Sequence, residues 1–374
     1  MALALYCPNC GYYEKEEDRI GRRGDYFTST SVGGLLGELL AFQFAEWCGS
    51  SQGSGTMGGV QGMGSGPVQI VEAGAHDGRL AGDVLTWISH HRPASFERLQ
   101  YWILEPSTSR LAWQRRGLAG FGDKVRWASD LAELRTTLAR PTDHGDRATV
   151  RGVIFCNELL DAMPVHRLGW DVRQHVWFEW GVALRGEEFI WTRMKAADLR
   201  RDNPESKVAS PIAHLQHSTG PEVLEVLPDG FSIEVCPAAE QWWHEAANAL
   251  RHGRLVSIDY GFTSDELLMP ERKAGTLRAY HHHRLSSDVL AHPGEQDITA
   301  HVNFAAIQAV GKSAGLTTES FLTQAQFLTG IAARAWQAPG SLTGWTPEHT
   351  RQFQTLTHPE HLGRSFRVLV QSRL

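Results

Sequence analysis

The stretch Val68–Leu80, VQIVEAGAHDGRL, decides the fold class of this chain. Residues 68–72 are typical of a buried strand, Gly74 and Gly78 bracket a tight turn, and residues 79–90 place apolar side chains on one face of a predicted helix. An open α/β sheet holds nucleotide-like ligands beyond the carboxyl end of a strand with this order of strand, glycine turn and helix. The stretch therefore predicts such a sheet, with a ligand site at the end of its first strand.

Two acidic residues indicate which ligand this site takes. Glu72 ends the first strand, and Glu105 ends the next one, in YWILEP. A carboxylate in the second position can accept hydrogen bonds from two ribose hydroxyls, so the pair favours a nucleoside cofactor over a phosphate. The turn alone does not decide, because Gly74–Gly78 lacks the middle glycine of a nicotinamide fingerprint and also fits a plain turn. Glu105 also fits a favourable charge at the start of the next helix.

Strands and helices alternate downstream of this stretch. Predicted strands cover 68–72, 100–105, 124–127 and 150–156, and predicted helices cover 79–90, 107–118 and 131–139. This alternation predicts a Rossmann-like, mainly parallel sheet with helices on both faces. Aromatic hairpins at 165–192 then indicate a β-rich insertion at about 165–235. Further helices are expected at 238–251, 301–313 and 347–357, with a strand at 254–259 and a last strand, SFRVLVQSRL, at the sheet edge.

The chain is expected to divide near residue 66. Residues 1–66 are predicted to form an N-terminal helical lobe, with a helix at 33–48 and a glycine-rich loop at 49–66, and residues 67–374 form the sheet domain with its insertion. The loop composition cannot bury a core. A phosphate-binding loop is the alternative, but no Gly-Lys-Ser/Thr ending follows the glycines.

Composition is that of a soluble globular enzyme and indicates few special partners. The 374 residues are 42% hydrophobic and 21% charged, with a net charge of −6, so we expect no nucleic-acid partner. No apolar run is long enough for a bilayer, and the start MALALYCPNC lacks the pattern of a signal peptide, so we expect a cytoplasmic protein without a membrane partner. Cys7 and Cys10 resemble half of a zinc site, but no second pair completes it, and we expect reduced thiols and no metal.

Polar residues follow the fourth predicted strand in FCNELLDAMPVH. Asn157, Glu158 and Asp161 come directly after the apolar run, where sheet enzymes place their chemistry. Glu158 and Asp161 are three residues apart, so on a helical turn both carboxylates face one side and can hold a planar cation. A capped helix start, with Asn157 as the N-cap, is the alternative.

A third cluster lies near the end of the chain, in DITAHVN. His301 follows Asp297 by four residues, a spacing that can orient an imidazole on one helix face. The alternative is a helix start with Thr299 as its cap. The run His281–His283 is interpreted as solvated loop residues.

Several segments together resemble the MidA family, the bacterial and mitochondrial methyltransferases linked to assembly of respiratory complex I. They run nearly end to end in the family's order: LYCPNCGYY, GDYFTSTSVGGLLGELLA, VEAGAHDGRL, ILEPS, NELLDAMPV, IDYGF, GTLRAY, HPGEQDITAHVNF and HPEHLGRSFRVL. The resemblance implies the seven-stranded sheet of class I methyltransferases that use S-adenosylmethionine. It also implies a protein arginine as methyl acceptor and a protein substrate such as a complex I subunit, while the oligomeric state stays unknown.

The resemblance also implies roles for individual residues. The methionine part of S-adenosylmethionine would lie along Glu72, Gly74 and Gly78, its ribose on Glu105, its adenine near Asp130, and its methyl group before Asn157 and Glu158. We expect Glu158, supported by Asp161, to orient the guanidinium, and His301 to accept the released proton.

Two positions depart from the family pattern. His76 stands where the family usually has glycine, and Ser29-Thr30-Ser31 stands where it usually has Ala-Pro-Glu. Two other functions therefore stay open. One is a binding or assembly protein that kept the sheet without efficient catalysis, and the other is a methyltransferase for a small molecule.

Overall fold

A mainly parallel eight-stranded sheet forms the centre of the computed structural model. The model describes residues 1–15, 29–49, 67–139, 149–194, 215, 224–281, 284–286, 288–338, 340–341 and 344–374. The strand order is β14 (Thr317–Thr323), β15 (Phe366–Arg373), β9 (Leu250–Phe262), β4 (Val150–Asn157), β1 (Val68–Ala73), β2 (Leu99–Leu104) and β3 (Val125–Ala128), and β13 (Val302–Asn303) pairs with β9. Among its described strands, β15 alone runs opposite to the others, so its pairings with β9 and β14 are antiparallel and the rest are parallel. The predicted fold class is confirmed.

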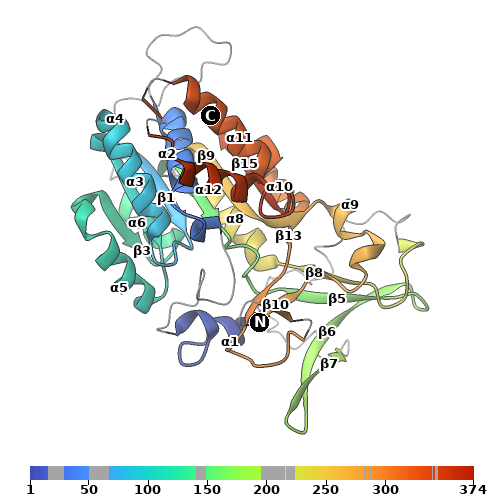
Figure 1. The fold of residues 1–374 in the computed structure, drawn as a ribbon. Helices are drawn as coiled ribbons and strands as arrows, with labels where there is room; N and C mark the ends of the chain where they lie inside the picture. Colours follow the sequence, from blue (N-terminus) through green and yellow to red (C-terminus); the bar gives the residue numbers. More distant parts are fainter. Residues whose placement is uncertain are drawn as a thin grey trace.

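Helices cover both faces of this sheet (Figure 1). One face packs against α2 (Leu35–Cys48), α3 (Arg79–His91) and α11 (Gln324–Gln337), and the other against α6 (Leu131–Leu138), α8 (Pro237–Ala249) and α10 (Phe304–Ser313). Ile70 belongs to the first apolar core and Val71 to the second, because successive side chains of a strand point to opposite faces. The other α-helices of the described residues are α1 (Ala2–Tyr6), α4 (Pro93–Arg98), α5 (Thr108–Gly117), α9 (Ser264–Leu267) and α12 (Pro347–Thr357).

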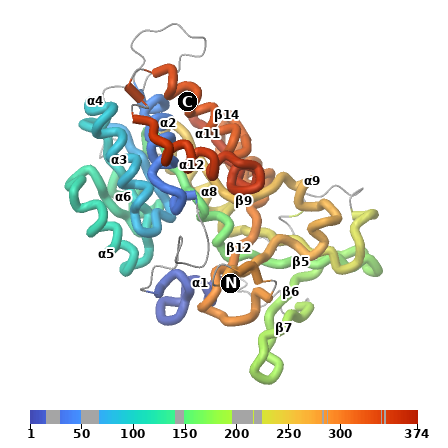
Figure 2. The backbone as a smooth tube through the Cα atoms, viewed as in Figure 1, coloured from blue at the N-terminus to red at the C-terminus, as the bar shows by residue number. Residues whose placement is uncertain are grey.

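Two antiparallel sheets are added beside the central one. The insertion after β4 forms β5 (His166–Asp171), β6 (Val176–Arg185), β7 (Glu188–Arg193) and β8 (Ser232–Val235), as predicted. The smaller sheet consists of β10 (Arg278–His281), β11 (Arg284–Ser286) and β12 (Asp297–Thr299). Figures 1 and 2 show β6 and β7 extending away from the body of the molecule. In the described part of the chain, no helix has the length and apolarity needed to cross a membrane.

The N-terminal residues do not pack as one lobe. Helix α2 belongs to the same apolar core as α3 and the central sheet. The first segment, with α1 (Ala2–Tyr6) and a short 3-10 helix at Tyr12–Glu14, packs instead against the smaller sheet: Leu5 and Tyr12 share a core with Ala279 and Ile298. In Figure 2 this segment lies beside β12, well away from α2. The glycine-rich loop lies, from residue 50 to 66, outside the described residues.

Two sequence predictions about local structure, and the alternative given for one of them, were wrong. The C-terminal strand β15 is not at the edge, because β14 pairs with its outer side, and the polar sequence TTESFLT gave no strong strand signal. Asp297 and His301 do not share a helix face, since Asp297 starts strand β12 and α10 begins only at Phe304. Its cap is Asn303, whose side chain accepts from two backbone N–H groups, and not Thr299.

Candidate active site

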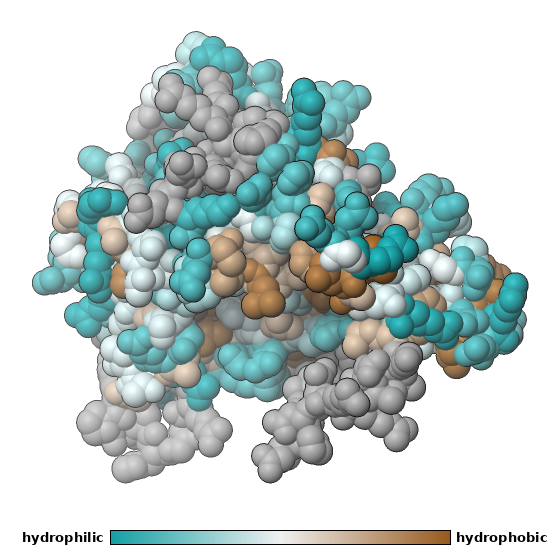
Figure 3. Space-filling view, turned by 90° about the horizontal axis from the view of Figure 1, so that it is seen from below, coloured by the Kyte–Doolittle hydropathy of each residue, from teal (hydrophilic) through white to brown (hydrophobic). Residues whose placement is uncertain are grey.

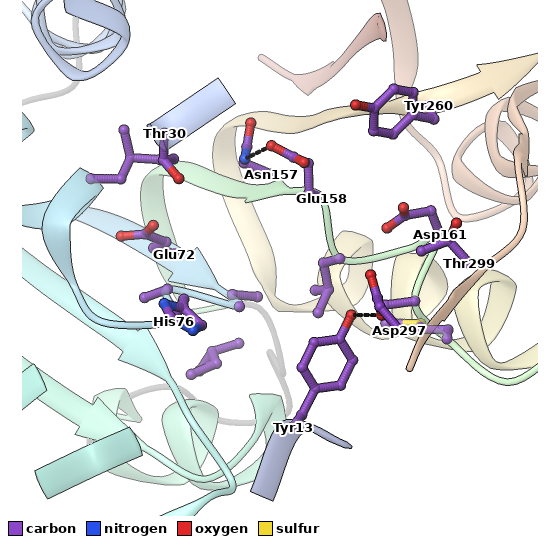
Figure 4. Close-up of a pocket in the computed structure, with 18 of the residues that line it drawn as sticks. Tyr13, Thr30, Glu72, His76, Asn157, Glu158, Asp161, Tyr260, Asp297 and Thr299 are labelled. Atoms are coloured by element: carbon purple, nitrogen blue, oxygen red, sulfur yellow. Dashed lines mark hydrogen bonds between the residues drawn. The ribbon is translucent and has the colours of Figure 1, made fainter. Parts of the chain in front are cut away.

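A cavity of about 720 Å³ lies at the carboxyl ends of β1, β2 and β4. Ligand sites of small-molecule enzymes fall in this size range. The residues predicted from the sequence that line it are Glu72, Gly74, Glu105, Asp130, Asn157, Glu158, Asp161 and His301. Gly78 caps α3 behind this lining, with a φ of +83°. The fold therefore brings nearly all candidate residues to one cavity (Figure 4).

We divide the cavity lining into two walls. The β1–β2 wall comprises Glu72, Gly74, His76, Glu105 and Asp130, and the β12 wall comprises Tyr13, Asp161, Tyr260, Asp297 and His301. Asn157 and Glu158 at the end of β4 lie between them. Figure 3 looks at the molecule from below, where apolar residues, in brown, border a hollow near the middle of this face.

The first residue of the β1–β2 wall is Glu72, near the carboxyl end of β1. Glu72 is buried and accepts a hydrogen bond of 2.6 Å from the Tyr101 hydroxyl on β2. Burial raises the pKa of Glu72 to about 7, although the bond from Tyr101 lowers it. Gly74 follows with a φ of +78°, a conformation that glycine adopts without strain.

His76 occupies a backbone position that favours glycine. Its φ is +47°, which explains physically why a glycine suits this turn. The imidazole packs edge-on against Trp113, with ring centroids 6.2 Å apart, and the backbone carbonyl accepts a bond from Gln114. His76 lines the cavity, so its side chain is accommodated at the wall.

Two hydrogen bonds orient the carboxylate of Glu105, directly after β2. Its two oxygens accept bonds of 2.9 Å from the backbone N–H of Ser107 and from the Gln114 side chain. Burial raises the pKa of Glu105. Asp130 lies nearby at the end of β3, where it caps α6 by accepting from the N–H of Glu133 at 2.8 Å.

The turn after β4 presents Glu158. It is not the helical turn expected from the sequence, because Glu158 has a φ of +52° and Asn157 ends the strand instead of capping a helix. Such a conformation costs a non-glycine residue about 1–2 kcal/mol, and strain of this kind collects at functional sites. The backbone N–H of Ser29 and the Asn157 side chain both donate to Oε1 of Glu158, at 2.9 and 3.1 Å. These bonds fix the direction of the carboxylate.

The surroundings of Glu158 favour its protonated form when no cation is present. Burial raises the pKa of Glu158 to about 8, and the nearby Asp161 and Asp297 also raise it, while the bonds from Ser29 and Asn157 lower it. A cation bound beside Glu158 would favour the carboxylate again.

Asp259, in the IDYGF segment of β9, holds the turn in place. One of its oxygens accepts from the backbone N–H groups of Leu160, at 2.9 Å, and Leu159, at 3.2 Å. Asp161 lies against it, and burial together with the Asp259 charge raises the pKa of Asp161 well above its usual range. The backbone N–H of Asp161 also donates to the same Asp259 oxygen, at 3.4 Å, so Asp259 binds three successive N–H groups of the turn.

Asp297 and Tyr13 form the far side of the cavity. Asp297 is the first residue of β12 and is buried, and the Tyr13 hydroxyl donates a bond of 2.6 Å to its Oδ1. Figure 4 shows this pair across the cavity from Glu158. The predictions did not include Tyr13, and its only signal in the sequence was the tyrosine pair in the family-like segment LYCPNCGYY.

His301 stacks on Phe262, with ring centroids 4.7 Å apart and planes 13° apart. Burial lowers the pKa of His301 to about 4, and the charge of Arg278 lowers it further. The imidazole is therefore neutral near pH 7.

Three further residues, to which the sequence analysis assigned no role in the site, line the same cavity: Thr30, Tyr260 and Arg278. Thr30 belongs to the segment where the family pattern has Ala-Pro-Glu. The backbone of neighbouring Ser29 bonds Glu158, so this segment contributes to the site through its main chain.

The cavity residues fit an S-adenosyl cofactor. Glu105 offers two oriented carboxylate oxygens for ribose hydroxyls, and Asn157 holds a buried Oδ1 that has no hydrogen-bond partner among the described residues. A ligand donor would satisfy this orphaned acceptor.

Comparisons with known proteins agree with this fit. A family model for S-adenosyl-L-methionine-dependent methyltransferases matches residues 53–322. A Burkholderia thailandensis protein, crystallised bound to S-adenosyl-homocysteine, superposes with a TM-score of 0.75 at 27% identity over 100% of this chain and 86% of its own. The protein arginine methyltransferase NDUFAF7 homolog, mitochondrial, of Drosophila melanogaster is 24% identical over 99% of this chain and 79% of its length. Human NDUFAF7 is 25% identical over 84% of this chain and 66% of its length.

The strand order and the site at its carboxyl edge define a methyltransferase of the S-adenosylmethionine-dependent class. The chain belongs to the S-adenosyl-L-methionine-dependent methyltransferase family whose model covers most of it. Its cofactor is S-adenosylmethionine.

Proposed function

We propose that this methyltransferase transfers the methyl group to a guanidino nitrogen of an arginine in a protein substrate. The observation that carries the proposal is Glu158, whose carboxylate is fixed through Oε1 by Ser29 and Asn157 and turned into the cavity at the end of β4. Figure 4 shows its second oxygen turned away from Asn157. Relatives named as protein arginine methyltransferases support the choice of acceptor.

Glu158 would make the acceptor nucleophilic by orienting its charge. A guanidinium stays protonated at neutral pH, with a pKa above about 12, and is a poor nucleophile. A carboxylate that accepts its N–H groups localises the positive charge near itself and away from the attacking nitrogen. Bound S-adenosylmethionine supplies a methyl group on a positively charged sulfur. Glu158 therefore has to align one guanidino nitrogen with that methyl group.

The same residue is the better proton acceptor. Transfer breaks the S–CH₃ bond, leaves its electron pair on sulfur, forms an N–CH₃ bond and releases one N–H proton. The pKa of Glu158 is raised to about 8 by burial, whereas burial lowers that of His301 to about 4. Without a bound cation, Glu158 therefore has the higher proton affinity of the two, and His301 stays the other predicted acceptor of the released proton.

The decisive experiment is Glu158→Gln. We expect turnover of a pool of peptides with one arginine each to fall at least about 100-fold, because the amide neither localises the charge nor accepts the proton. Binding of S-adenosyl-homocysteine, measured by calorimetry, should stay within about tenfold, which corresponds to about 1.4 kcal/mol. Normal turnover by this variant would remove Glu158 from the mechanism.

The identity of the protein substrate and the compartment are further parts of the proposal. A complex I subunit is the substrate that the family resemblance implies, and the link to the relatives rests on their names alone. Cytoplasmic retention stays a prediction from the N-terminal sequence, and these relatives are named as mitochondrial. The other candidate acceptor is an uncharged small molecule. Such a molecule would place no positive charge beside the carboxylates of Glu158 and Asp297 in the cavity.

A further inference from the structure

Acidic side chains in and behind the β12 wall have no part in the methyl transfer proposed for Glu158. Asp161, Asp259 and Asp297 all lie near Glu158, and their roles differ. Asp259 accepts from the backbone N–H groups of Leu159, Leu160 and Asp161 in the turn after Glu158. Asp259 and Asp161 therefore belong to the turn after β4. Asp297 lies instead at the start of β12, where the Tyr13 hydroxyl donates a hydrogen bond to it.

Asp297 is oriented by a residue far away in the sequence. The Tyr13 hydroxyl donates to Asp297 Oδ1 at 2.6 Å. Tyr13 is itself fixed from the opposite side, because Arg110 of α5 donates to its carbonyl oxygen at 2.9 and 3.2 Å and lies over its ring at 5.3 Å from the centroid. Arg110 also forms an ion pair with Glu14, whose Oε1 lies 3.8 Å from Nη2. Tyr13 spans from α5 to β12 and holds the Asp297 carboxylate at the cavity.

We propose that Asp297 of the β12 wall, oriented by Tyr13, selects a positively charged acceptor side chain by binding it across the cavity from Glu158. A guanidinium presents five N–H donors in one plane, more than one carboxylate can accept. With Glu158 on one edge, a second carboxylate across the cavity can accept donors on another edge of the same group (Figure 4). This inference rests on the proposed transfer to arginine and adds the residue that discriminates charged from neutral acceptors.

Because Asp297 is proposed to bind the acceptor and not to take part in methyl transfer, its substitution should change KM and leave kcat nearly unchanged. In Asp297→Asn, we expect the KM for the best arginine peptide to rise about tenfold while kcat stays within about twofold. The affinity for S-adenosyl-homocysteine should stay within about twofold, which also shows that the site is folded. Glu295→Gln removes an exposed negative charge two residues away, outside the cavity lining, and should leave KM unchanged.

A neutral isostere supplies a readout that a merely structural role would not move. Replacing the arginine of the peptide by citrulline keeps the shape and removes the charge. We expect the wild-type protein, loaded with S-adenosyl-homocysteine, to bind the arginine peptide with a lower Kd than the citrulline peptide. The preference is the ratio of these two Kd values, and Asp297→Asn should reduce it about tenfold. Tyr13→Phe keeps the ring beneath Arg110 and loses the bond to Asp297, so it should reduce the preference about threefold.

The outcomes separate the two proposals. If the wild type methylates arginine peptides but Asp297→Asn keeps both the KM and the preference over citrulline, only the role of Asp297 is overturned. An equal loss of kcat and of cofactor affinity in Asp297→Asn would also overturn it, since it would show a structural effect. If the wild type methylates only uncharged acceptors, the proposed function and this inference fall together.

Discussion

The β1–β2 wall and the β12 wall meet in one cavity but are built in different ways. The first consists of residues at or just beyond the carboxyl ends of β1, β2 and β3, such as Glu72 near the end of β1 and Glu105 directly after β2. The second gathers Tyr13, Asp161 and Asp297 from segments far apart in the sequence, including the N-terminal segment packed on the smaller sheet. The contrast teaches that the wall predicted to bind the cofactor follows from one repeated local motif, whereas the wall proposed to bind the acceptor depends on how added segments pack.

A substitution in the β1–β2 wall alone tests whether the two walls bind different ligands. In Glu105→Gln, we expect the Kd for S-adenosyl-homocysteine to rise about 30-fold, or about 2 kcal/mol, because a charged acceptor of ribose hydroxyls becomes neutral. Calorimetry measures this change. The KM for the arginine peptide at saturating S-adenosylmethionine should stay within about twofold.

Glu97→Gln is the matched control, because Glu97 is exposed just before the opposite end of β2 and should leave both constants unchanged. If Glu105→Gln changes the peptide KM as much as the cofactor Kd, the two walls do not act separately.

The pH dependence tests the residue between the walls. Burial raises the pKa of Glu158 to about 8, and the deprotonated form is the one that binds a cation. The kcat/KM for the arginine peptide should therefore rise with pH, with a midpoint at or below about pH 8, since the charge of bound S-adenosylmethionine favours the carboxylate. Two pH units below the midpoint, we expect a loss of about 100-fold relative to the plateau, and about tenfold one unit below.

The measurement is a set of initial rates between pH 6 and 9 at saturating cofactor, which excludes effects of Glu72 on cofactor binding. The residual rate of Glu158→Gln should lack this rise. A flat wild-type profile, or the same rise in the variant, would contradict the assignment.

The sequence predicted the sheet and the β1–β2 wall because both depend on local signals. Apolar runs, glycine turns and acidic strand ends identify β1, β2 and β4 within a few residues. The bond from Ser29 to Glu158 and that from Tyr13 to Asp297 link residues more than a hundred positions apart, and no periodicity encodes such pairings. The left-handed Glu158 was missed for a related reason: the spacing to Asp161 fits a helical turn, but the backbone bonds to Asp259 impose another one.

His76 provides the smallest and most local test of the β1–β2 wall. Its φ of +47° strains a non-glycine residue, so His76→Gly relieves about 1 kcal/mol, while the greater freedom of glycine in the unfolded chain opposes it by about 0.5–1 kcal/mol. The unfolding free energy should therefore change by less than about 1 kcal/mol. Because the ring packs against Trp113, we expect the Kd for S-adenosyl-homocysteine to change less than about threefold. Chemical denaturation and calorimetry measure both values, and a tenfold gain in affinity would mean that the imidazole obstructs the cofactor.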